Sequence, residues 1–389
     1  MKIVADKNIP FIQEYFDGYG ELILKSGRFI SPQDLRDADI LLVRSITHVD
    51  EKLLANTRVK FVGSVTAGAD HLDTKYLDEA GIIWSVAAGF NAPPVADYVM
   101  SSIAALQSKN VLKQDQVKAA VIGVGNVGRL VVERMKYLNF DIILCDPIRA
   151  QEEKNFVSTA LQDLSDLDFI SLHVPLIKTG EHSTYHFIDK HFLKKQKPGC
   201  VLLNASRGSV VHSQELLEHG SHLHWCFDVW EGEPNINKTI LEQARIATPH
   251  IAGYSVQAKI RGIEMIYRIA CEKGMIEAKP ISPIVMPKQR LNFSNHSRVA
   301  NHSSFVKQSQ SQSCCWQDIV LGVFNPLVIT EMMRALLLPS SDEEAGHSFD
   351  EMRNQFNYRY EFGYTNVLGG DVSEGDRAVL EGLNFRLSG

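Results

Sequence analysis

Arg207, Glu233 and His250 have the side-chain chemistry that hydride transfer at the carbon of a hydroxy acid requires. A planar guanidinium can hold a carboxylate through two parallel hydrogen bonds. A histidine titrates near neutral pH, so it can take up or return the hydroxyl proton. A carboxylate beside that histidine would orient the imidazole and favour its protonated form. Each residue alone is more often an ordinary surface group, but all three follow successive apolar runs, which favours a shared catalytic role.

A glycine-rich motif precedes these residues, between an apolar run and an amphipathic helix pattern. Glycine permits the tight turn and the close approach of a pyrophosphate, and the N-terminus of the following helix attracts negative charge. Asp146 ends the next apolar run, where a carboxylate would bind the ribose hydroxyls and repel a 2′-phosphate. This pattern predicts NAD rather than NADP; the alternative is a glycine-rich turn with a solvated aspartate. The predicted cofactor-binding residues of the loop are Gly123, Gly125, Asn126, Val127 and Gly128.

Short apolar runs alternate with helical patterns along most of the chain, which is typical of βαβ units and a mostly parallel sheet. The expected strands of the first part are Lys2–Ala5, Leu22–Leu24, Ile40–Val43, Phe61–Ser64 and Ile82–Val86. Those of the second part are Val117–Ile122, Ile142–Cys145, Phe169–Val174, Cys200–Leu203, Trp225–Val229 and Ile246–Thr248. Ligands of open parallel sheets bind outside the carboxyl ends of the strands. We therefore expect Asp146, Arg207, Asp228, Glu233 and His250 to face one crevice, with Asp228 holding the nicotinamide carboxamide.

Several helix ends are also predicted. Ser31 followed by proline reads as an N-cap, Gly81 as the left-handed residue that ends the helix 73–80, and Ser255–Gly274 as one long capped helix. The proline-containing stretch 279–283 is typical of a linker, and residues 292–313, crowded with Ser, Asn, His and Gln, are expected to form a mobile or long loop.

These patterns predict three domains. The substrate-binding lobe is expected at 1–95 plus 254–280, the NAD-binding domain at 96–253, and a linker with a small C-terminal domain at 281–389. The fold class is α/β: two Rossmann-like or flavodoxin-like parallel-sheet lobes with a cleft between them, plus a small C-terminal α+β domain. A unit that small often gains stability by docking or dimerising.

Composition excludes several classes of protein. The 389 residues carry a net charge of −6, which argues against nucleic-acid or anionic-membrane binding. No apolar run is long enough to span a membrane, and the six cysteines form neither a disulfide framework nor a zinc pattern. No metal is predicted, because His182, His186 and His191 have no ligand partners at suitable spacing and read as surface residues. A cytoplasmic enzyme is expected.

The glycine loop, Asn204–Gly208, Asp228–Pro234 and Pro249–Gly253 together resemble the D-isomer-specific 2-hydroxyacid dehydrogenase family, over roughly residues 1–275. Further motifs resemble the branch of this family that oxidises 4-phospho-D-erythronate with NAD in pyridoxal 5′-phosphate synthesis. They are Val43–Thr47, Thr66–His71, Leu144–Pro147, Asp228–Pro234, His250–Tyr254 and, in the C-terminal extension, Phe349–Arg353, which resembles that branch's dimerisation domain.

The resemblance implies roles for individual residues and a homodimer formed through the C-terminal domain. Arg207 and Glu233 would be active-site residues and His250 the proton donor. The implied cofactor contacts are Asp146, Val174, Ala205, Ser206, Arg207, Asp228 and Gly253. The implied contacts with the phosphorylated hydroxy acid are Ser45, Thr66 and Tyr254.

One departure and two alternatives remain open. His212 stands where the family usually has an aspartate that we interpret as a helix N-cap, and Ser213 is expected to replace it. The substrate could instead be another 2-hydroxy acid, such as 3-phosphoglycerate. The chain could also be an NAD-sensing binding protein like the corepressors that share this fold.

Overall fold

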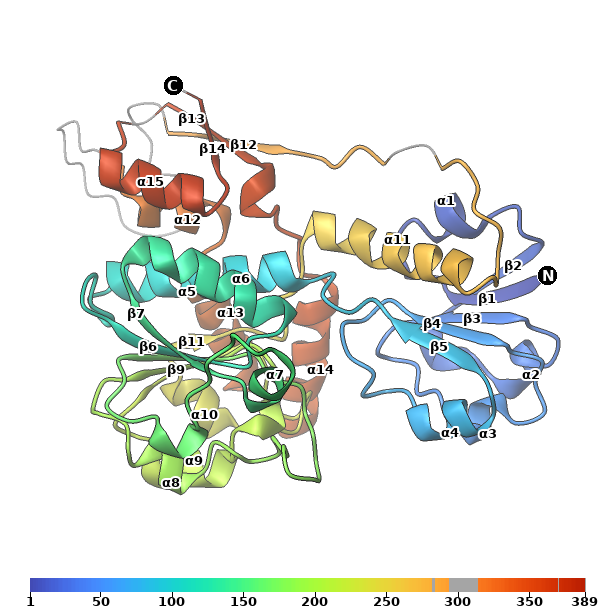
Figure 1. Cartoon of the computed structure of the whole chain (residues 1–389), viewed down its shortest axis with the longest axis horizontal. Helices are drawn as coiled ribbons and strands as arrows, with labels where there is room; N and C mark the ends of the chain where they lie inside the picture. The colour runs from blue at the N-terminus through green and yellow to red at the C-terminus, as the bar shows by residue number, and fades with distance from the viewer. Residues whose placement is uncertain (282–283, 294–313, 370, 389) are drawn as a thin grey trace. The chain divides into compact units, whose positions relative to one another are not determined.

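The computed structural model describes residues 1–281, 284–293, 314–369 and 371–388 (Figure 1). The stretch expected to be a mobile or long loop lies, from residue 294 to 313, outside the described residues. The chain divides into two compact units, which are described separately. The first contains Met1–Asn91 and Ser255–Met286, and the second contains Ala92–Tyr254 and Pro287–Gly389.

The first unit has a five-stranded parallel sheet in the order β2-β1-β3-β4-β5. Its strands are β1 Lys2–Asp6, β2 Glu21–Lys25, β3 Ile40–Val43, β4 Phe61–Ser64 and β5 Ile83–Val86. Its short helices are α1 Ile12–Phe16, η1 Gly27–Phe29, α2 Pro32–Leu35, α3 Glu51–Leu54 and α4 Thr74–Glu79. The five strand predictions are confirmed to within a residue at most ends. The predicted cap at Ser31 is a capping box with Asp34, and Gly81 adopts φ +67°.

The long predicted helix is α11, Val256–Glu272, and it packs on the sheet of the first unit. Ser255 Oγ accepts a hydrogen bond from the Ala258 N–H at 2.9 Å, which satisfies one of the unpaired donors of the first turn. Ile263 and Ile266 are fully buried and belong to the same core cluster as the strand residues Ile3 and Phe61. The helical spacing of these isoleucines therefore encodes the face that enters the core.

The second unit has a six-stranded parallel sheet in the order β11-β10-β9-β8-β6-β7. The strands are β6 Lys118–Ile122, β7 Asp141–Cys145, β8 Phe169–Leu172, β9 Val201–Asn204, β10 His224–Phe227 and β11 Ile246–Ala247. The helices and turns between them are α5 Ala92–Ser108, α6 Asn126–Met135, η2 Lys136–Leu138, α7 Pro147–Glu152, η3 Leu161–Asp163, α8 Lys190–Leu193, η4 Gly208–Val210, α9 Ser213–His219 and α10 Lys238–Gln243. All six strand predictions are confirmed. Because β6 lies between β7 and β8, the order of connections reverses there, as in other doubly wound sheets.

The C-terminal segment packs within the second unit. It contains α12 Trp316–Val323, α13 Pro326–Leu337, α14 Asp342–Asn354, η5 Phe362–Tyr364 and α15 Glu374–Gly382. A small parallel sheet in the order β12-β13-β14 joins β12 Gln289–Asn292, β13 Thr365–Leu368 and β14 Arg386–Ser388. Thr330 of α13 contacts the edge strand β11: its Oγ1 accepts a hydrogen bond from Ala247 N at 2.9 Å and lies 3.2 Å from Ala247 O.

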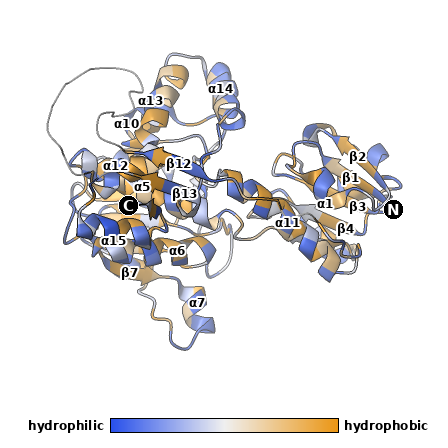
Figure 2. Ribbon diagram, turned by 90° about the horizontal axis from the view of Figure 1, so that it is seen from above, coloured by the Kyte–Doolittle hydropathy of each residue, from blue (hydrophilic) through white to orange (hydrophobic). Residues whose placement is uncertain are grey.

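The helices of this unit differ in the environment that they meet. Figure 2 shows α13 as mainly hydrophobic and α7 as mainly hydrophilic, and α7 buries none of its residues.

Within the described residues, no single helix has the length and apolar composition to cross a membrane; the bent pair α12 and α13 meets that test only when taken together. Whether the segment 281–389 acts as a separate dimerisation domain stays a prediction.

Candidate active site

The loops that carry the predicted catalytic residues leave three neighbouring parallel strands at the same edge. The loop with Arg207 follows β9, the loop with Glu233 follows β10, and His250 follows β11. Backbone bonds continue the pairing past the strand ends, because Asp228 N donates to Asn204 O at 3.0 Å and Thr248 N donates to Phe227 O at 3.0 Å. Neighbouring strands lie about 4.8 Å apart. The strand order therefore brings the starts of these loops within about 10 Å of each other.

Glu233 and His250 form a hydrogen-bonded pair. Glu233 Oε2 lies 2.8 Å from His250 Nδ1, and Oε1 accepts from Trp230 N, also at 2.8 Å. With the carboxylate ionised, Nδ1 donates, so Nε2 is the nitrogen that remains for exchange with a substrate hydroxyl. The imidazole keeps 32% of its side-chain surface exposed, whereas Glu233 keeps 19%. The pair thus has the geometry of a general acid–base with its orienting carboxylate.

The charge state of Glu233 follows from its surroundings. Burial alone would raise the pKa of this carboxyl group. The charge and hydrogen bond of His250, the hydrogen bond from Trp230 and the charge of Arg353 outweigh burial and hold the pKa below its ordinary value. Glu233 is therefore a carboxylate at neutral pH, and an imidazolium formed beside it during proton transfer is stabilised.

Asp228 anchors the backbone around His250. Its buried carboxylate accepts hydrogen bonds from Thr248 Oγ1 at 2.6 Å, Ile251 N at 2.8 Å and Ala252 N at 2.9 Å. Burial raises the pKa of Asp228, although His250 and these donors favour the charged form. His250 adopts φ +58°, an uncommon conformation that this network holds in place. The predicted contact of Asp228 with the carboxamide stays a prediction; the structure shows the residue organising the loop.

The Arg207 loop is held by its own side chains and by close backbone packing. Asn204 Nδ2 donates to Arg207 O at 2.9 Å, and Asn204 Oδ1 accepts from both N and Oγ of Ser206. Gly208 lies against the backbone of Trp230, where any Cβ would overlap the Trp230 carbonyl group. The glycine after Arg207 is therefore required for the β9 and β10 loops to meet. Arg207 is half-buried, and its Nη1 donates to Ser206 O at 2.8 Å.

The glycine loop fits a dinucleotide pyrophosphate. It joins β6 to α6 at the point where the strand order reverses, and Gly125 is the N-cap of α6 without a side-chain cap. A Cβ at Gly123, where φ is +85°, would lie 2.5 Å from His173 O, and one at Gly128 would overlap Gly123 O. A Cβ at Gly125 would meet nothing within 4 Å. The outer two glycines thus serve packing, while Gly125 leaves the loop open to a ligand.

The side chains that flank the loop suit the rest of the cofactor. Asp146 follows β7; its Oδ2 accepts from Val124 N at 2.8 Å and its Oδ1 from Arg149 N at 3.0 Å. A carboxylate has about four acceptor positions, so ribose hydroxyls can still bind. Val174 follows β8, and its Cγ1 would lie 2.9 Å from a Cβ at Gly123. Bound NAD would supply the carbon that accepts the hydride.

Replacing Asp146 with alanine is expected to raise the dissociation constant for NAD by about tenfold, because charge-assisted hydrogen bonds are lost. The difference between the affinities for NAD and NADP should become smaller, since the 2′-phosphate of NADP is no longer repelled by a carboxylate. Fluorescence titrations with both cofactors measure the effect. Asp163→Ala, an exposed aspartate of η3, is the matched control. Unchanged NAD affinity in the Asp146 variant would contradict the assignment.

The predicted substrate contacts lie in both units. In the first unit Ser45 is exposed after β3, and Thr66 follows β4, where its Oγ1 donates to Gly68 O at 2.8 Å and lies 2.8 Å from Ser64 Oγ. In the second unit Tyr254 stacks on Tyr358, with ring centroids 5.3 Å apart. Contact of Ser45, Thr66 and Tyr254 with substrate stays a prediction.

Two expectations near α9 were wrong. The N-cap of α9 is His212, without a side-chain cap, and Ser213 is the first helical residue; its N–H donates to Glu231 Oε2 at 3.3 Å instead. His186 is not a free surface residue, because its ring stacks on Tyr185 and His212 and its Nε2 lies 2.5 Å from Glu231 Oε1. Glu231, in the loop after β10, contacts both Ser213 and His186. Its position depends on the tertiary structure, so the sequence could not indicate either contact.

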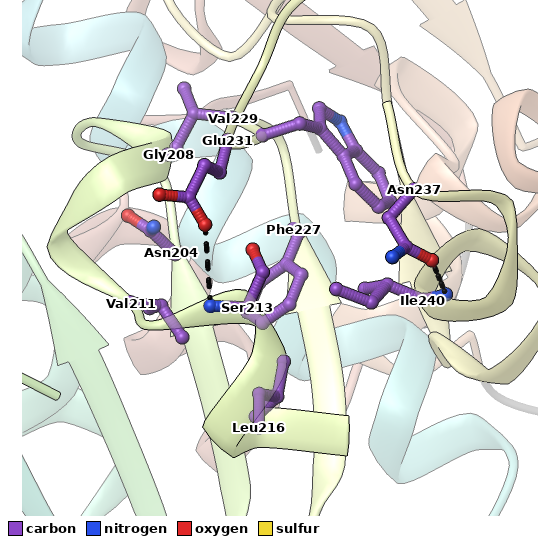
Figure 3. A pocket seen from close by; sticks show the side chains of 11 residues that line it. Asn204, Gly208, Val211, Ser213, Leu216, Phe227, Val229, Glu231, Asn237 and Ile240 are labelled. Atoms are coloured by element: carbon purple, nitrogen blue, oxygen red, sulfur yellow. Dashed lines mark hydrogen bonds between the residues drawn. The ribbon is translucent and has the colours of Figure 1, made fainter. Parts of the chain in front are cut away.

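A small cavity lies beside this contact (Figure 3). Figure 3 shows Glu231 pointing toward Ser213, and Asn237, whose Oδ1 accepts from Ile240 N at 3.2 Å, on the opposite side. The cavity measures about 10 Å³, room for roughly one water molecule. Arg207, Glu233 and His250 are not among its lining residues. It is therefore not the predicted reaction site.

Sequence reasoning missed Thr248, Arg353 and Arg359. Thr248 holds Asp228, Arg353 Nε donates to Tyr254 Oη at 3.1 Å, and Arg359 Nη2 donates to Ala252 O at 2.6 Å. The two arginines lie about 100 residues after the loop that they contact, so no local pattern connects them. Within the described residues, no group of three His, Cys, Asp or Glu side chains is arranged to hold a metal ion.

Comparison with known proteins defines the class first. A family model described as the NAD-binding domain of D-isomer-specific 2-hydroxyacid dehydrogenases matches residues 97–252. The NAD⁺-bound 3-phosphoglycerate dehydrogenase of Entamoeba histolytica has the same fold, with a TM-score of 0.59, 22% identity and coverage of 73% of this chain and 99% of that one. This chain belongs to the D-isomer-specific 2-hydroxyacid dehydrogenase family and is an NAD-dependent oxidoreductase.

Two curated relatives that match nearly the whole chain share one name, erythronate-4-phosphate dehydrogenase. The protein of Coxiella burnetii (strain RSA 331 / Henzerling II) is 43% identical over 93% of this chain and 93% of its own length. The protein of Pseudoalteromonas translucida (strain TAC 125) is 43% identical over 100% of both.

Proposed function

We propose that this chain oxidises 4-phospho-D-erythronate to (R)-3-hydroxy-2-oxo-4-phosphooxybutanoate and reduces NAD, as a step of pyridoxal 5′-phosphate synthesis. The observation that carries the proposal is the Glu233–His250 pair, which joins the loops after β10 and β11, next to the loop of Arg207 after β9. The relatives named erythronate-4-phosphate dehydrogenase match this chain almost from end to end. Similarity that extends past the shared family domain into the C-terminal segment favours this substrate over others of the family.

Each side chain has a distinct task in this reaction. Arg207 binds the C1 carboxylate and fixes the C2–H bond relative to the cofactor. His250 Nε2 removes the proton of the C2 hydroxyl as the hydride leaves C2 and the carbonyl forms. Glu233 keeps the ring oriented through Nδ1 and stabilises the imidazolium that results. In the reverse direction the same imidazolium returns the proton to the carbonyl oxygen.

The proposal includes a homodimer formed through the C-terminal segment, a cytoplasmic location, and no nucleic-acid or membrane partner. The supporting observation for the dimer is the resemblance of Phe349–Arg353 to the dimerisation segment of the proposed branch. Sedimentation of the full chain measures the oligomeric state directly.

A substrate panel tests the proposed function. The purified full chain is assayed for NADH formation with 4-phospho-D-erythronate, 3-phosphoglycerate and D-lactate. Turnover that is fastest with 4-phospho-D-erythronate supports the proposal. Preferred turnover of 3-phosphoglycerate would assign a different substrate, and NAD binding without turnover of any acid would favour a sensor.

A further inference from the structure

Arg353 of helix α14, in the C-terminal segment, contacts the loop that follows His250. Its Nε donates a hydrogen bond to Tyr254 Oη at 3.1 Å, and Tyr254 is four residues after His250 in the chain. Its charge also acts on Glu233, although both oxygens of that carboxylate bind Trp230 and His250 instead. Arg353 is therefore near enough to act on the charge of Glu233, and it replaces neither hydrogen bond of that carboxylate.

The position of Arg353 is set by the packing of α14. Gly346 lies against the loop after Glu233, where a Cβ would overlap Asn235 Oδ1 and lie 3.8 Å from Pro234 Cγ. Phe349 is fully buried in the core of the second unit. Residues 346, 349 and 353 have the spacing i, i+3, i+7 and so share one face of the helix. The face that packs on the unit is thus the face that presents Arg353 to the Glu233 loop.

The segment that follows α14 also contacts the His250 loop, through ring stacking and hydrogen bonds. Tyr358 stacks on Tyr254 with an interplanar angle of 8°, and the buried Arg359 donates to Ile251 O at 3.3 Å and Ala252 O at 2.6 Å. Contacts on both sides of Arg353 therefore hold it at a fixed place relative to His250. A guanidinium held in this way is preorganised for a ligand.

The charge of the proposed substrate requires such a group. A carboxylate and a phosphate monoester together carry close to three negative charges at neutral pH. Arg207 offers one cation, which the reaction uses on the carboxylate next to C2. The distal phosphate needs a second cation. A guanidinium suits this role because it binds phosphate oxygens through two hydrogen bonds.

We infer that Arg353 is a substrate-binding residue that holds the phosphate group of the hydroxy acid, so that the C-terminal segment completes the substrate site of the second unit. This inference rests on the proposed function. Burial alone would lower the pKa of Arg353, but Tyr254, Glu233 and Asp350 raise it above its ordinary value, so the side chain stays charged at every working pH. Tyr254 binds the guanidinium through Nε. In the inferred complex, the two Nη groups bind the phosphate oxygens.

The test compares 4-phospho-D-erythronate with D-erythronate, which has no phosphate, in the wild-type chain and in Arg353→Gln. The ratio of kcat/KM for the two substrates is expected to fall roughly 10²-fold in the variant, mainly through a higher KM for the phosphorylated acid. Both substrates are measured on the same sample, so the ratio does not depend on the fraction of folded enzyme. Arg353→Lys should restore part of the ratio, because it keeps the charge without the planar fork.

Arg377→Gln, an exposed arginine of α15, removes the same charge and should leave the ratio unchanged. Inorganic phosphate is a second probe: it should compete with 4-phospho-D-erythronate in the wild-type chain and compete more weakly in Arg353→Gln. An unchanged ratio and unchanged phosphate inhibition in Arg353→Gln would overturn the inference while the proposed function stands. Absence of wild-type turnover with 4-phospho-D-erythronate would overturn both.

Discussion

Replacing His250 with alanine is expected to lower kcat for 4-phospho-D-erythronate by about 10²- to 10⁴-fold, the usual contribution of a positioned general base. The loss should appear in kcat rather than in cofactor binding, because the imidazole contacts Glu233 and the reacting hydroxyl. Steady-state NADH formation measures kcat, and titration with NADH measures cofactor affinity.

His191→Ala serves as the control, since His191 is an exposed histidine of α8 and lies outside the loops of the site. This control should keep wild-type kcat. Near-normal turnover in His250→Ala would exclude His250 as the proton-transfer residue. Loss of NADH affinity in parallel with kcat would instead indicate that the loop held by Asp228 has collapsed.

Replacing Arg207 with glutamine is expected to reduce kcat/KM by about 10²- to 10³-fold, because a charged partner of the substrate carboxylate is lost. Arg207→Lys should recover only part of the loss, since an ammonium group cannot form the paired hydrogen bonds of a guanidinium. The loop itself should persist in both variants, because Asn204 and Gly208 hold its backbone.

The measurement is kcat and KM for the hydroxy acid at saturating NAD. Arg268→Gln removes an exposed arginine of α11 and should leave both constants unchanged. If KM and kcat were unaltered in Arg207→Gln, the carboxylate would be bound elsewhere. Together with the Arg353 experiment, the result assigns each anionic end of the substrate to one guanidinium.

The electrostatics of the site explain why its carboxylates serve different purposes. Asp228 is buried, accepts hydrogen bonds from three donors and organises the backbone. Glu233 keeps 19% of its side chain exposed, bonds His250 and is influenced by the charge of Arg353. Burial raises the pKa of Asp228, while neighbouring positive charge lowers that of Glu233. The sequence predicts that Glu233 orients His250 and that Asp228 holds the nicotinamide carboxamide. The hydrogen bonds by which Asp228 organises the backbone after His250 are seen only in the tertiary structure.

Local features of the sequence determined the secondary structure and the placement of the site residues along it. The apolar runs correspond to all eleven strands of the two large sheets, and the caps at Ser31 and Ser255 are where residue type predicted them. Hydrophobic periodicity and capping act over a few residues, so they can be read directly. The glycine loop and Asp146 were identifiable for the same reason, because their chemistry depends on short spacing.

Tertiary structure decided what depends on distant residues. The order of the strands places β6 next to β8 and the Arg207, Glu233 and His250 loops side by side. Glu231 reaches Ser213, so the expected serine cap does not form. Arg353 and Arg359 contact the His250 loop, although they lie about 100 residues after it in the sequence. No periodic pattern in the sequence predicts these contacts. Such contacts arise from the packing of whole elements, and a chain pattern that repeats every two to four residues contains no information about them.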